Sequence, residues 1–420
     1  MGGSSEGKTA LFRVVDAWFG RLACAVCTIW RSVTESIFGR KSDAARTGVL
    51  FIKLAEQGST VLAATAIADA VHQYGAANIY FLVFEENRFV LDSMELIPWE
   101  NVLVIKTGSM TQILTTALQQ LLRIRKMGLL ACVDLEFFAR STAVYAYLTG
   151  IPRRVGFHSY FGEGPWRGNL FTHRPRYNPH MHTSVLFRAL VASIPMKGSS
   201  FPRFEWVPPE GEPPALPKFY PTPEEERSMR ALIETSGAGN RSALVLLNAN
   251  ASDLLPLRRW DDANYVELAK KVLALSDRHY VGFTGAPSEK EKISRLTELV
   301  GSERAFCTAG KTTLRELLAL YQLSDVMVTN DSGPAHFAAL TDIDAVVLFG
   351  PETPALFSAL SPRSHPVTAN LACSPCVSAL NNRQTACDNN VCMQRISVER
   401  VFAEVCAALE RRKARATVAV

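Results

Sequence analysis

Two polar turns, each following an apolar run, contain the residue types that bind an anion. Asn330 to Gly333 follows the apolar run Val326 to Val328, and Gly350 to Pro354 follows Ala345 to Phe349. Pro334 suits the first turn of a helix, where its missing N–H costs nothing. Ligands bind at the carboxyl edge of an open parallel sheet, and a helix N-terminus at that edge attracts negative charge. The spacing therefore predicts a site for a diphosphate group.

The elements that must position these turns alternate between strand and helix along most of the chain. Short apolar runs predict strands at residues 48–53, 78–84, 102–106, 131–135, 243–247, 279–284, 326–328 and 345–349. Amphipathic runs between them, such as Met110 to Lys126, predict helices. Strands that alternate with helices indicate doubly wound parallel sheets, so we expect an α/β fold.

Composition divides the chain into four parts. Residues 1–45 are predicted to be an N-terminal amphipathic extension, and residues 46–200 a first Rossmann-like domain. Residues 201–240 begin with a proline-rich run, which predicts an extended and fairly stiff linker. Residues 241–420 are predicted to form a second Rossmann-like domain, which contains both polar turns.

Several segments resemble glycosyltransferase family 9, the heptosyltransferase-like family. In the second domain they are DSGPAH at 331–336 and FGPETP at 349–354; in the first they are VDLEFFARS at 133–141 and TGIPRRVGF at 149–157. The resemblance covers roughly residues 48–408. It implies the GT-B architecture, in which two Rossmann-like domains face a cleft. The first domain then takes the acceptor and the second takes the donor.

The resemblance also implies an activity, inverting glycosyl transfer. The implied donor is a nucleotide diphosphate sugar such as an ADP-heptose, and the implied acceptor is a lipopolysaccharide or another lipid-linked glycan. No cofactor and no metal are implied. In the family a basic residue just before a Trp meets the donor phosphates, so Arg258 and Arg259 are alternatives for that role. The donor-binding residues carried over from the family are Asp331, Ser332, Gly333, Pro334, His336, Arg258, Arg259, Thr284, Gly285, Glu289 and Gly350.

The general base is the point at which this chain departs from the family. The family's loop after the first strand contains Gly-Asp, with the Asp as base, whereas this chain has Gly58 and Ser59. A serine needs help to act as that base. Glu56 in the same loop and Glu136 after the VDL run are the candidate replacements. Glu136 is favoured, because its apolar neighbours are expected to raise its pKa toward a useful range, and Glu56 then orients the acceptor.

Two other classes of protein remain open. A family member that has lost its base is a non-catalytic sugar-nucleotide-binding protein. A sugar-nucleotide epimerase has the same two-domain architecture. Release of nucleotide diphosphate only when an acceptor is present distinguishes the transferase from both.

The composition limits the class further. The chain has 420 residues, of which 48 % are hydrophobic and 20 % charged, and this suits a globular protein of two or three domains. A net charge of +5 is too small to indicate nucleic-acid binding, but it suits an anionic sugar nucleotide or membrane surface. No apolar run is long enough to span a bilayer and no secretory signal is visible, so we expect a cytoplasmic protein.

Residues 11–38 predict an amphipathic helix with Trp, Phe and Arg side chains. Such a helix suits the membrane interface, which predicts a peripheral protein at the inner face of the cytoplasmic membrane. A helix that packs on the body of the protein fits the same pattern. Both interpretations remain open.

Four cysteines near the C-terminus have the spacing C-x2-C-x10-C-x4-C, and they are Cys373, Cys376, Cys387 and Cys392. The spacing fits a zinc knuckle, a pair of disulfides or a turn-rich loop with four thiols. No acid or base accompanies them, so the prediction is a structural role and not a catalytic one.

Overall fold

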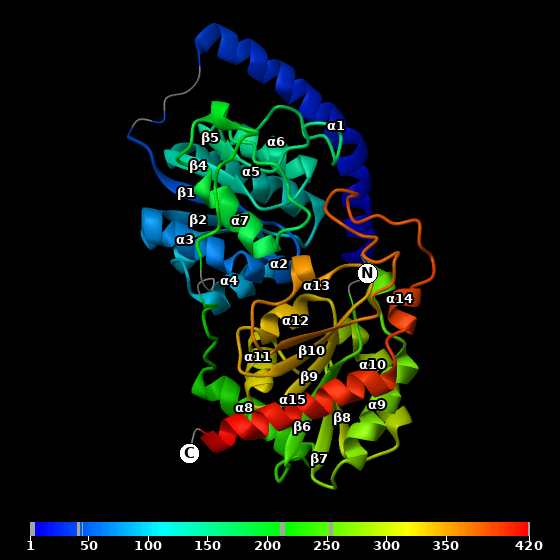
Figure 1. The fold of residues 1–420 in the computed structure, drawn as a ribbon. Helices are drawn as coiled ribbons and strands as arrows, with labels where there is room; N and C mark the ends of the chain where they lie inside the picture. The colour runs from blue at the N-terminus through cyan, green and yellow to red at the C-terminus, as the bar shows by residue number, and fades with distance from the viewer. Residues whose placement is uncertain (1–4, 40–42, 44, 211–214, 252–254, 419–420) are drawn as a thin grey trace. The chain divides into compact units, whose positions relative to one another are not determined.

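The computed structural model of the chain consists of two compact units (Figure 1). The structure describes residues 5–39, 43, 45–210, 215–251 and 255–418. Unit 1 contains residues 1–217 together with 377–385, and unit 2 contains residues 218–376 and 386–420. Each unit has its own parallel sheet, as the sequence predicts.

Unit 1 is built on a five-stranded parallel sheet with the strand order β3-β2-β1-β4-β5. Its strands are β1 (Thr47–Ile52), β2 (Ile79–Phe84), β3 (Val102–Ile105), β4 (Leu129–Asp134) and β5 (Arg153–Val155). Val49 pairs with Ile79 on one side of β1 and with Ala131 on the other. The winding direction changes between β1 and β4, which makes the carboxyl ends of these two strands the switch point of the sheet.

On one face of the unit 1 sheet, Leu50, Leu82 and Cys132 contribute buried side chains to a core that the sheet shares with helices. The residues of β1 from Val49 to Ile52 are all buried, as expected for the central strand of a parallel sheet. The helices between and after the strands are α2 (Gln57–Leu62), α3 (Ala64–Tyr74), α4 (Arg88–Met94), α5 (Met110–Lys126), α6 (Arg140–Leu148) and α7 (Thr183–Ala192).

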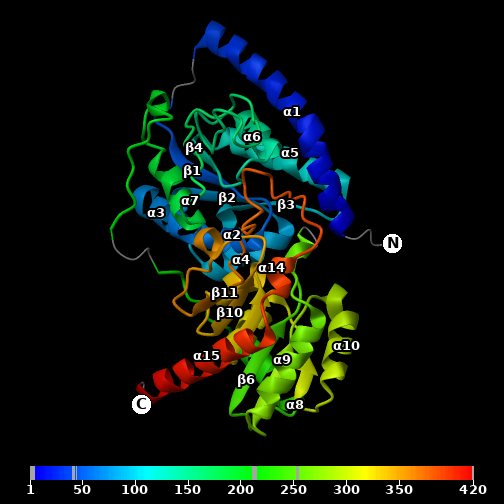
Figure 2. The same cartoon turned by 45° about the vertical axis from the view of Figure 1, so that its right-hand side comes forward.

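Helix α1, Ser5–Phe38, lies along unit 1 and packs against α6 (Figure 2). On its inner face Cys24 is fully buried. Arg31 donates hydrogen bonds to the backbone oxygens of Asn169 at 2.5 Å and Phe171 at 3.1 Å. One face of the predicted amphipathic helix is therefore part of the body of unit 1.

The opposite face of α1 is apolar and exposed. Its exposed large hydrophobic residues are Phe19, Leu22, Val26, Ile29, Trp30, Val33, Ile37 and Phe38. The side chains of Leu11, Val14, Val15 and Trp18, which belong to the predicted pattern, lie outside the described residues. Within the ranges that the structure describes, no helix combines the length and the apolar character needed to cross a membrane.

Unit 2 is built on a six-stranded parallel sheet with the order β11-β10-β9-β6-β7-β8. Its strands are β6 (Ala243–Asn248), β7 (His279–Phe283), β8 (Ala305–Cys307), β9 (Val326–Asn330), β10 (Asp344–Phe349) and β11 (Ser364–Thr368). Val245 pairs with Val281 on one side and with Val326 on the other. The switch point of this sheet lies between β6 and β9, because the chain winds outward through β7 and β8 and then returns to the far side of β6.

The helices of unit 2 cover a core in which Val328, Val346 and Ile396 are almost fully buried. They are α8 (Pro223–Thr235), α9 (Asp262–Ala274), α10 (Lys290–Val300), α11 (Leu314–Gln322), α12 (Gly333–Ala338), α13 (Pro354–Phe357), α14 (Val391–Gln394) and α15 (Val398–Val418).

The range 201–240 differs from the extended linker that its composition predicts, because it contains α8. Thr222 and Glu225 form a capping box at the start of α8, and Pro223 occupies its first turn. The proline therefore initiates a helix here and does not extend the chain. The backbone N–H of Phe219, just before α8, already donates to Leu340 of unit 2 at 2.8 Å.

The segment 377–385, which we call the strap, belongs to unit 1 although the chain on both sides of it belongs to unit 2. Val377 and Ala379 are buried. Asn382 and Arg383 have φ angles of 54° and 53°, in the left-handed region that side chains disfavour. Such strain persists only where the surrounding contacts hold it, and it is concentrated at functional positions.

Candidate active site

The switch point of the unit 1 sheet brings together the two carboxylates proposed as bases. Lys53 directly follows β1, Glu56 lies three residues further on, and Glu136 follows β4. Nζ of Lys53 lies 2.8 Å from Glu136 Oε2 and 3.3 Å from Glu56 Oε2. The structure therefore joins both sequence-predicted residues through one lysine.

Lys53 is fully buried, and burial lowers its pKa while Glu136 opposes that shift. A buried ammonium needs paired carboxylates to stay charged. The two glutamates therefore have an electrostatic reason to converge at this point.

Glu136 uses both of its carboxylate oxygens inside unit 1. Its Oε1 accepts hydrogen bonds from the backbone N–H groups of Leu54 at 2.9 Å and Ala55 at 3.0 Å, and its Oε2 accepts from Lys53. Its side chain is 12 % exposed. The carboxylate thus fixes the backbone that follows β1, and this is a positioning role.

Glu56 is the more open of the two, with a side chain that is 26 % exposed. Its φ angle of 66° is left-handed, which is uncommon for a residue with a side chain. Ser59 Oγ lies 3.2 Å from Glu56 Oε2 and donates to the backbone oxygen of Glu56 at 3.0 Å. Ser59, at the position of the family's Asp, therefore holds a carboxylate in place of supplying one.

The strap contributes a cation to this site. Arg383 forms an ion pair with Glu56 Oε1, and its guanidinium lies 5.8 Å from the ring centre of Phe137. Glu56, Asn382 and Arg383 all have positive φ angles, so strained backbone lies on both sides of one contact. The sequence offered no signal for Arg383, because its partner is more than three hundred residues away.

A second buried ion pair supports the loop after β4. Arg167 donates to Asp134 Oδ2 at 2.6 Å, and the N–H of Glu136 donates to Asp134 Oδ1 at 3.1 Å. Burial raises the pKa of Asp134 to about 6, and Arg167 opposes that rise. Asp134 thereby holds the backbone of Glu136 in place.

The switch point of the unit 2 sheet contains the predicted phosphate-binding turn. Asp331 follows β9, and Arg258 lies in the loop after β6. Nε of Arg258 lies 3.6 Å from Asp331 Oδ2, and Nη1 donates to the backbone oxygen of Asp331 at 3.2 Å. Nη2 forms an ion pair with Glu352, which lies in the FGPETP turn after β10. The sequence predicts the FGPETP turn as part of the site, but Glu352 is not among the predicted donor residues. The structure adds Glu352 to this cluster.

Burial changes the protonation of this cluster. It raises the pKa of Asp331, and it raises that of Glu352 to about 8 even though Arg258 opposes the shift. Asp331 adds to the rise at Glu352, because two buried carboxylates so close together do not both ionise readily. Near neutral pH the pair therefore keeps one proton, so Arg258 faces one negative charge from the two carboxylates and not two.

Asn330, the last residue of β9, fixes the loop that follows β6 relative to β9. Its Oδ1 accepts from the N–H of Trp260 at 3.0 Å, and its Nδ2 donates to the oxygen of Asn250 at 3.1 Å. Trp260 is buried and its Nε1 donates to Ile396 at 2.8 Å. The residues on either side of Arg258 are therefore tied to β9 and to the core.

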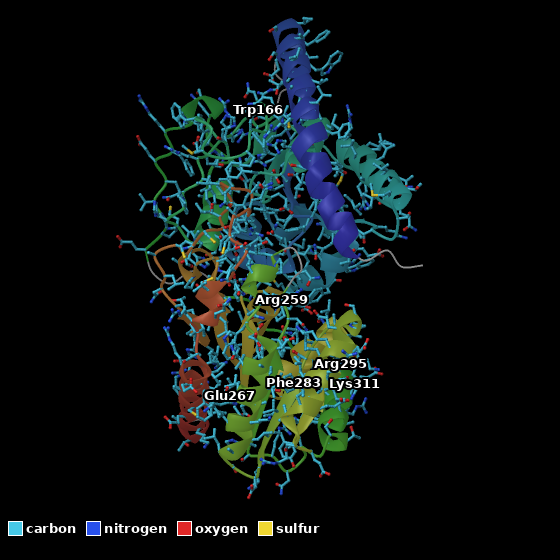
Figure 3. All side chains as sticks on the ribbon, turned by 90° about the vertical axis from the view of Figure 1, so that its right-hand side faces the viewer. Trp166, Arg259, Glu267, Phe283, Arg295 and Lys311 are labelled. Atoms are coloured by element: carbon cyan, nitrogen blue, oxygen red, sulfur yellow. The ribbon has the colours of Figure 1, made fainter. Side chains whose placement is uncertain are left out.

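The two arginines proposed as alternatives have different surroundings. Arg258 joins Asp331 and Glu352, whereas Nη2 of Arg259 donates to the backbone oxygen of Ala251 at 3.3 Å. Arg259 is labelled in Figure 3, where it can be located on the ribbon of unit 2. The geometry favours Arg258 for the phosphate role.

The remaining predicted donor residues lie on three loops. Ser332 precedes α12, whose buried His336 is only 6 % exposed, and Gly333 and Pro334 form its first turn. Thr284 Oγ1 accepts from Asn248 at 3.1 Å.

Glu289 is a helix-capping residue in this structure. Its Oε2 accepts from the N–H of Ala286 at 2.7 Å, in the turn after Gly285. Gly350 lies against α14, since a Cβ there would meet Met393 Sδ at 2.4 Å. Glycine at 350 is therefore required for close packing.

The four C-terminal cysteines lie beside the strap, in unit 2. No group of at least three His, Cys, Asp or Glu side chains in the described ranges is arranged to hold a metal ion. Cys376 and Cys387 both act on the pKa of Cys392, which burial raises. Cys376, Cys387 and Cys392 thus lie near one another, where the chain leaves and re-enters unit 2.

Comparison with known proteins confirms the resemblance for part of the chain. Residues 215–386 match the family model "Glycosyltransferase family 9 (heptosyltransferase)". The lipooligosaccharide heptosyltransferase 2 of Campylobacter jejuni is 30 % identical over 175 residues, which are 40 % of this chain and 51 % of that protein. The lipopolysaccharide heptosyltransferase 2 of Salmonella typhimurium is 34 % identical over 102 residues, which are 24 % of this chain and 29 % of that protein. The matched region thus spans about half of the first of these curated relatives and less than a third of the second.

The fold has relatives among solved structures. The E. coli ADP-heptose LPS heptosyltransferase II has a TM-score of 0.65 and 19 % identity, covering 87 % of this chain and 100 % of that one. This similarity confirms the predicted fold class, two parallel-sheet α/β domains of the GT-B type with an N-terminal helix.

Proposed function

We propose that the chain is an inverting glycosyltransferase that moves a heptose-like sugar from a nucleoside diphosphate to a lipopolysaccharide or another lipid-linked glycan. The observation that carries the proposal is the DSGPAH turn, which falls in the family match and lies at the switch point of its sheet. The relatives are named for lipopolysaccharide or lipooligosaccharide, and the E. coli protein is named for ADP-heptose. These names support an ADP-heptose-like donor.

Arg258 is the residue that stabilises the departing diphosphate. Protonation of the Asp331–Glu352 pair leaves Arg258 facing one negative charge, so the cluster repels a diphosphate less than a doubly ionised pair would. An arginine held by two loops needs little reorganisation when negative charge develops on the leaving group, which is the requirement for electrostatic catalysis. His336 and the first turn of α12 complete the donor contacts.

Glu56 is the general base, and Glu136 is a positioning residue that acts through Lys53. Glu136 is held by two backbone N–H groups and a buried lysine, whereas Glu56 is more exposed. This assignment reverses the preference drawn from sequence, which rested on the apolar neighbours of Glu136. Arg383 lies on the same carboxylate, so it is placed to pair with an anionic group of the acceptor as the hydroxyl approaches Glu56.

A lipid-linked acceptor requires that the protein reach a membrane. The exposed apolar face of α1 is the surface for that contact, with the helix lying in the interface at the inner face of the cytoplasmic membrane. The helix lies on the bilayer and does not cross it.

Donor binding is tested by thermal stabilisation of the full chain with ADP-, GDP-, UDP- and dTDP-sugars, since a ligand that binds only the folded state raises Tm. ADP-heptose is expected to give the largest shift. His336→Ala should weaken donor binding by about 1–3 kcal/mol through loss of a buried polar contact. Unchanged affinity in a folded His336→Ala protein would remove this residue from the site.

Turnover is tested by release of ADP with and without a lipopolysaccharide core acceptor. The transferase proposal requires release that depends on the acceptor. Donor binding without any acceptor-dependent release would instead favour the non-catalytic alternative, for which Ser59 at the position of the family's Asp is the supporting observation.

A further inference from the structure

A cavity of about 1080 Å³ lies in unit 1, away from the residues assigned to transfer. It is enclosed by the C-terminal half of α1, the ends of α5 and α6, the start of β5 and residues 195–199. The start of β5 and the ends of these helices mark the amino edge of a parallel sheet. Lys53, Glu56 and Glu136 lie at the opposite, carboxyl edge of that sheet.

One wall of the cavity is apolar and open to solvent. Val26, Trp30 and Phe38 of α1 and Leu148 of α6 line it and are 57 %, 64 %, 82 % and 40 % exposed. The wall continues into the exposed face of α1, which runs along the outer side of unit 1 (Figure 3). A second exposed apolar stripe lies on α5, the helix whose last turn reaches the cavity, and consists of Met110, Leu114, Leu118 and Leu122.

Much of the remaining lining is basic. Two of its arginines are neutralised by carboxylates that also line the cavity: Arg31 pairs with Glu35 at 2.7 Å and Arg153 pairs with Asp43 at 2.7 Å. Three further cations line the cavity without a carboxylate partner among the described residues, namely Arg125, Arg154 and Lys197.

These three cations differ in how firmly they are held. Arg154 is buried, and its guanidinium donates to the backbone oxygens of Leu170 at 2.8 Å and Ile151 at 2.7 Å. Arg125 and Lys197 are exposed side chains at the mouth of the cavity. The site therefore combines one fixed buried charge with two charges that are able to close on a ligand.

An exposed apolar wall together with three cations that form no ion pair among the described residues matches an amphiphile with an anionic head. We propose that this cavity binds the phosphate headgroup of an anionic phospholipid, with the acyl chains lying along the exposed face of α1. The volume is that of a small-molecule site, large enough for a glycerophosphate headgroup. This inference deepens the membrane contact of the proposed function, and it does not depend on glycosyl transfer.

Vesicle flotation of the full chain tests the proposal. The probes are vesicles of phosphatidylcholine alone and vesicles of equal parts phosphatidylcholine and phosphatidylglycerol. The double variant Arg125→Glu/Lys197→Glu is compared with Lys270→Glu/Arg295→Glu, which makes the same charge change on exposed residues of unit 2. Each basic residue near an anionic surface strengthens binding about fivefold. The cavity variant should therefore lose at least about 25-fold in partitioning onto the anionic vesicles, while the control stays close to the unmodified chain.

A second measurement distinguishes a site from a diffuse charge effect. Dihexanoyl phosphatidylglycerol, a water-soluble lipid, should raise the Tm of the unmodified chain and of the control variant but not that of the cavity variant. Equal flotation of the cavity and control variants would overturn the proposal. An equal rise in Tm with inorganic phosphate alone would overturn the lipid assignment.

The α1 contact is tested separately with Ile29→Asp, an exposed position of α1 that does not line the cavity, on vesicles of phosphatidylcholine alone. Loss of flotation there reports the apolar face of the helix, whereas the extra binding on anionic vesicles reports the cavity. Because neither assay contains a sugar nucleotide, failure of the lipid site and failure of the transferase proposal give different results.

Discussion

Glu352 is buried beside Asp331 and Arg258, and its protonation links the stability of unit 2 to pH. Its pKa is raised from 4.5 to about 8, mainly by burial, so the folded chain holds a proton that the unfolded chain releases at lower pH. The stability due to this proton is fully present below the unfolded value of 4.5 and is lost as pH rises through about 8. Unit 2, which contains the proposed donor site, is thus more stable at mildly acidic than at alkaline pH.

Replacing Glu352 by Gln mimics the protonated form at every pH. Tm measured from about pH 5 to about pH 9 should therefore fall less steeply in Glu352→Gln than in the unmodified chain. Glu267→Gln is the matched control, because Glu267 is an exposed residue of α9 (Figure 3). If the two variants have the same pH profile, Glu352 is ionised in the folded chain and the argument fails.

Glu56 and Glu136 share Lys53, but the geometry assigns them separable effects. Glu56→Gln should lower the rate of acceptor-dependent ADP release about 10²- to 10⁴-fold, the usual cost of losing a general base, with donor affinity retained. Its effect on Tm should be small, because its side chain is partly exposed. A rate within a few-fold of the unmodified chain would show that the base lies elsewhere.

Glu136→Gln should act mainly on stability. The substitution leaves the buried Lys53 without its nearest carboxylate, and breaking a buried pair typically costs about 3–5 kcal/mol. Denaturant unfolding measures this loss. The double variant Lys53→Met/Glu136→Gln removes the stranded charge and should recover part of the stability; no recovery would argue against the buried pair as the cause.

At the scale of elements, α1 serves two environments at once. Its inner face supplies Arg31 and Cys24 to unit 1, and its outer face is exposed and apolar. Deleting the whole helix therefore removes part of the protein body together with the proposed membrane contact. If a chain without α1 no longer floats with vesicles, the loss does not show that the exposed face of α1 is the anchor, because unit 1 is also damaged. Single substitutions on one face of α1 are therefore the informative variants.

Arg31→Ala tests the inner face. The guanidinium serves two backbone oxygens, so its loss should cost about 1–3 kcal/mol of unfolding free energy. Arg21→Ala, an exposed position on the same helix, is the control and should change stability by less than about 0.5 kcal/mol. Flotation on vesicles of phosphatidylcholine alone should be unaffected by Arg31→Ala as long as the chain remains folded. Equal stability of the two variants would mean that α1 is not part of the body of unit 1.

The sequence predicts the elements well where local pattern decides them, and less well elsewhere. Apolar runs in the sequence predict buried strands such as β1 and β10. The two turns of the proposed donor site are located in the sequence because each comes directly after such a run. Helix α8 was missed because a capping box at Thr222 lies inside a proline-rich stretch. The partnership of Arg258 with Glu352, and the pKa that it produces, depends on two loops meeting in space, and no local pattern encodes that meeting.

At the scale of the whole molecule, the strap is the feature that the sequence did not predict. Arg383 pairs with Glu56 and lies against Phe137. These partners are far apart in the sequence, and residues 218–376 between them belong to unit 2. Its side chain is 17 % exposed, so the contact is mostly shielded from solvent.

Arg383→Ala in the full chain should destabilise unit 1 by about 1 kcal/mol, from the partly buried ion pair and the aromatic contact. Arg383→Lys keeps the charge but not the planar guanidinium, and should lose less. Hydrogen exchange of the backbone around Glu56 measures the effect locally. Unchanged exchange in both variants would show that the strap does not support the loop after β1.

The strap also places a constraint on how the protein is made. A ribosome releases residues 1–217 about 160 residues before it reaches Val377. At about 5–20 residues per second, that interval is roughly ten to thirty seconds. During this time the nascent unit 1 lacks the segment that pairs with Glu56, and an N-terminal fragment that ends before the strap cannot contain the complete proposed acceptor site. Assembly of that site is therefore a late event of synthesis, and it cannot precede the translation of most of unit 2.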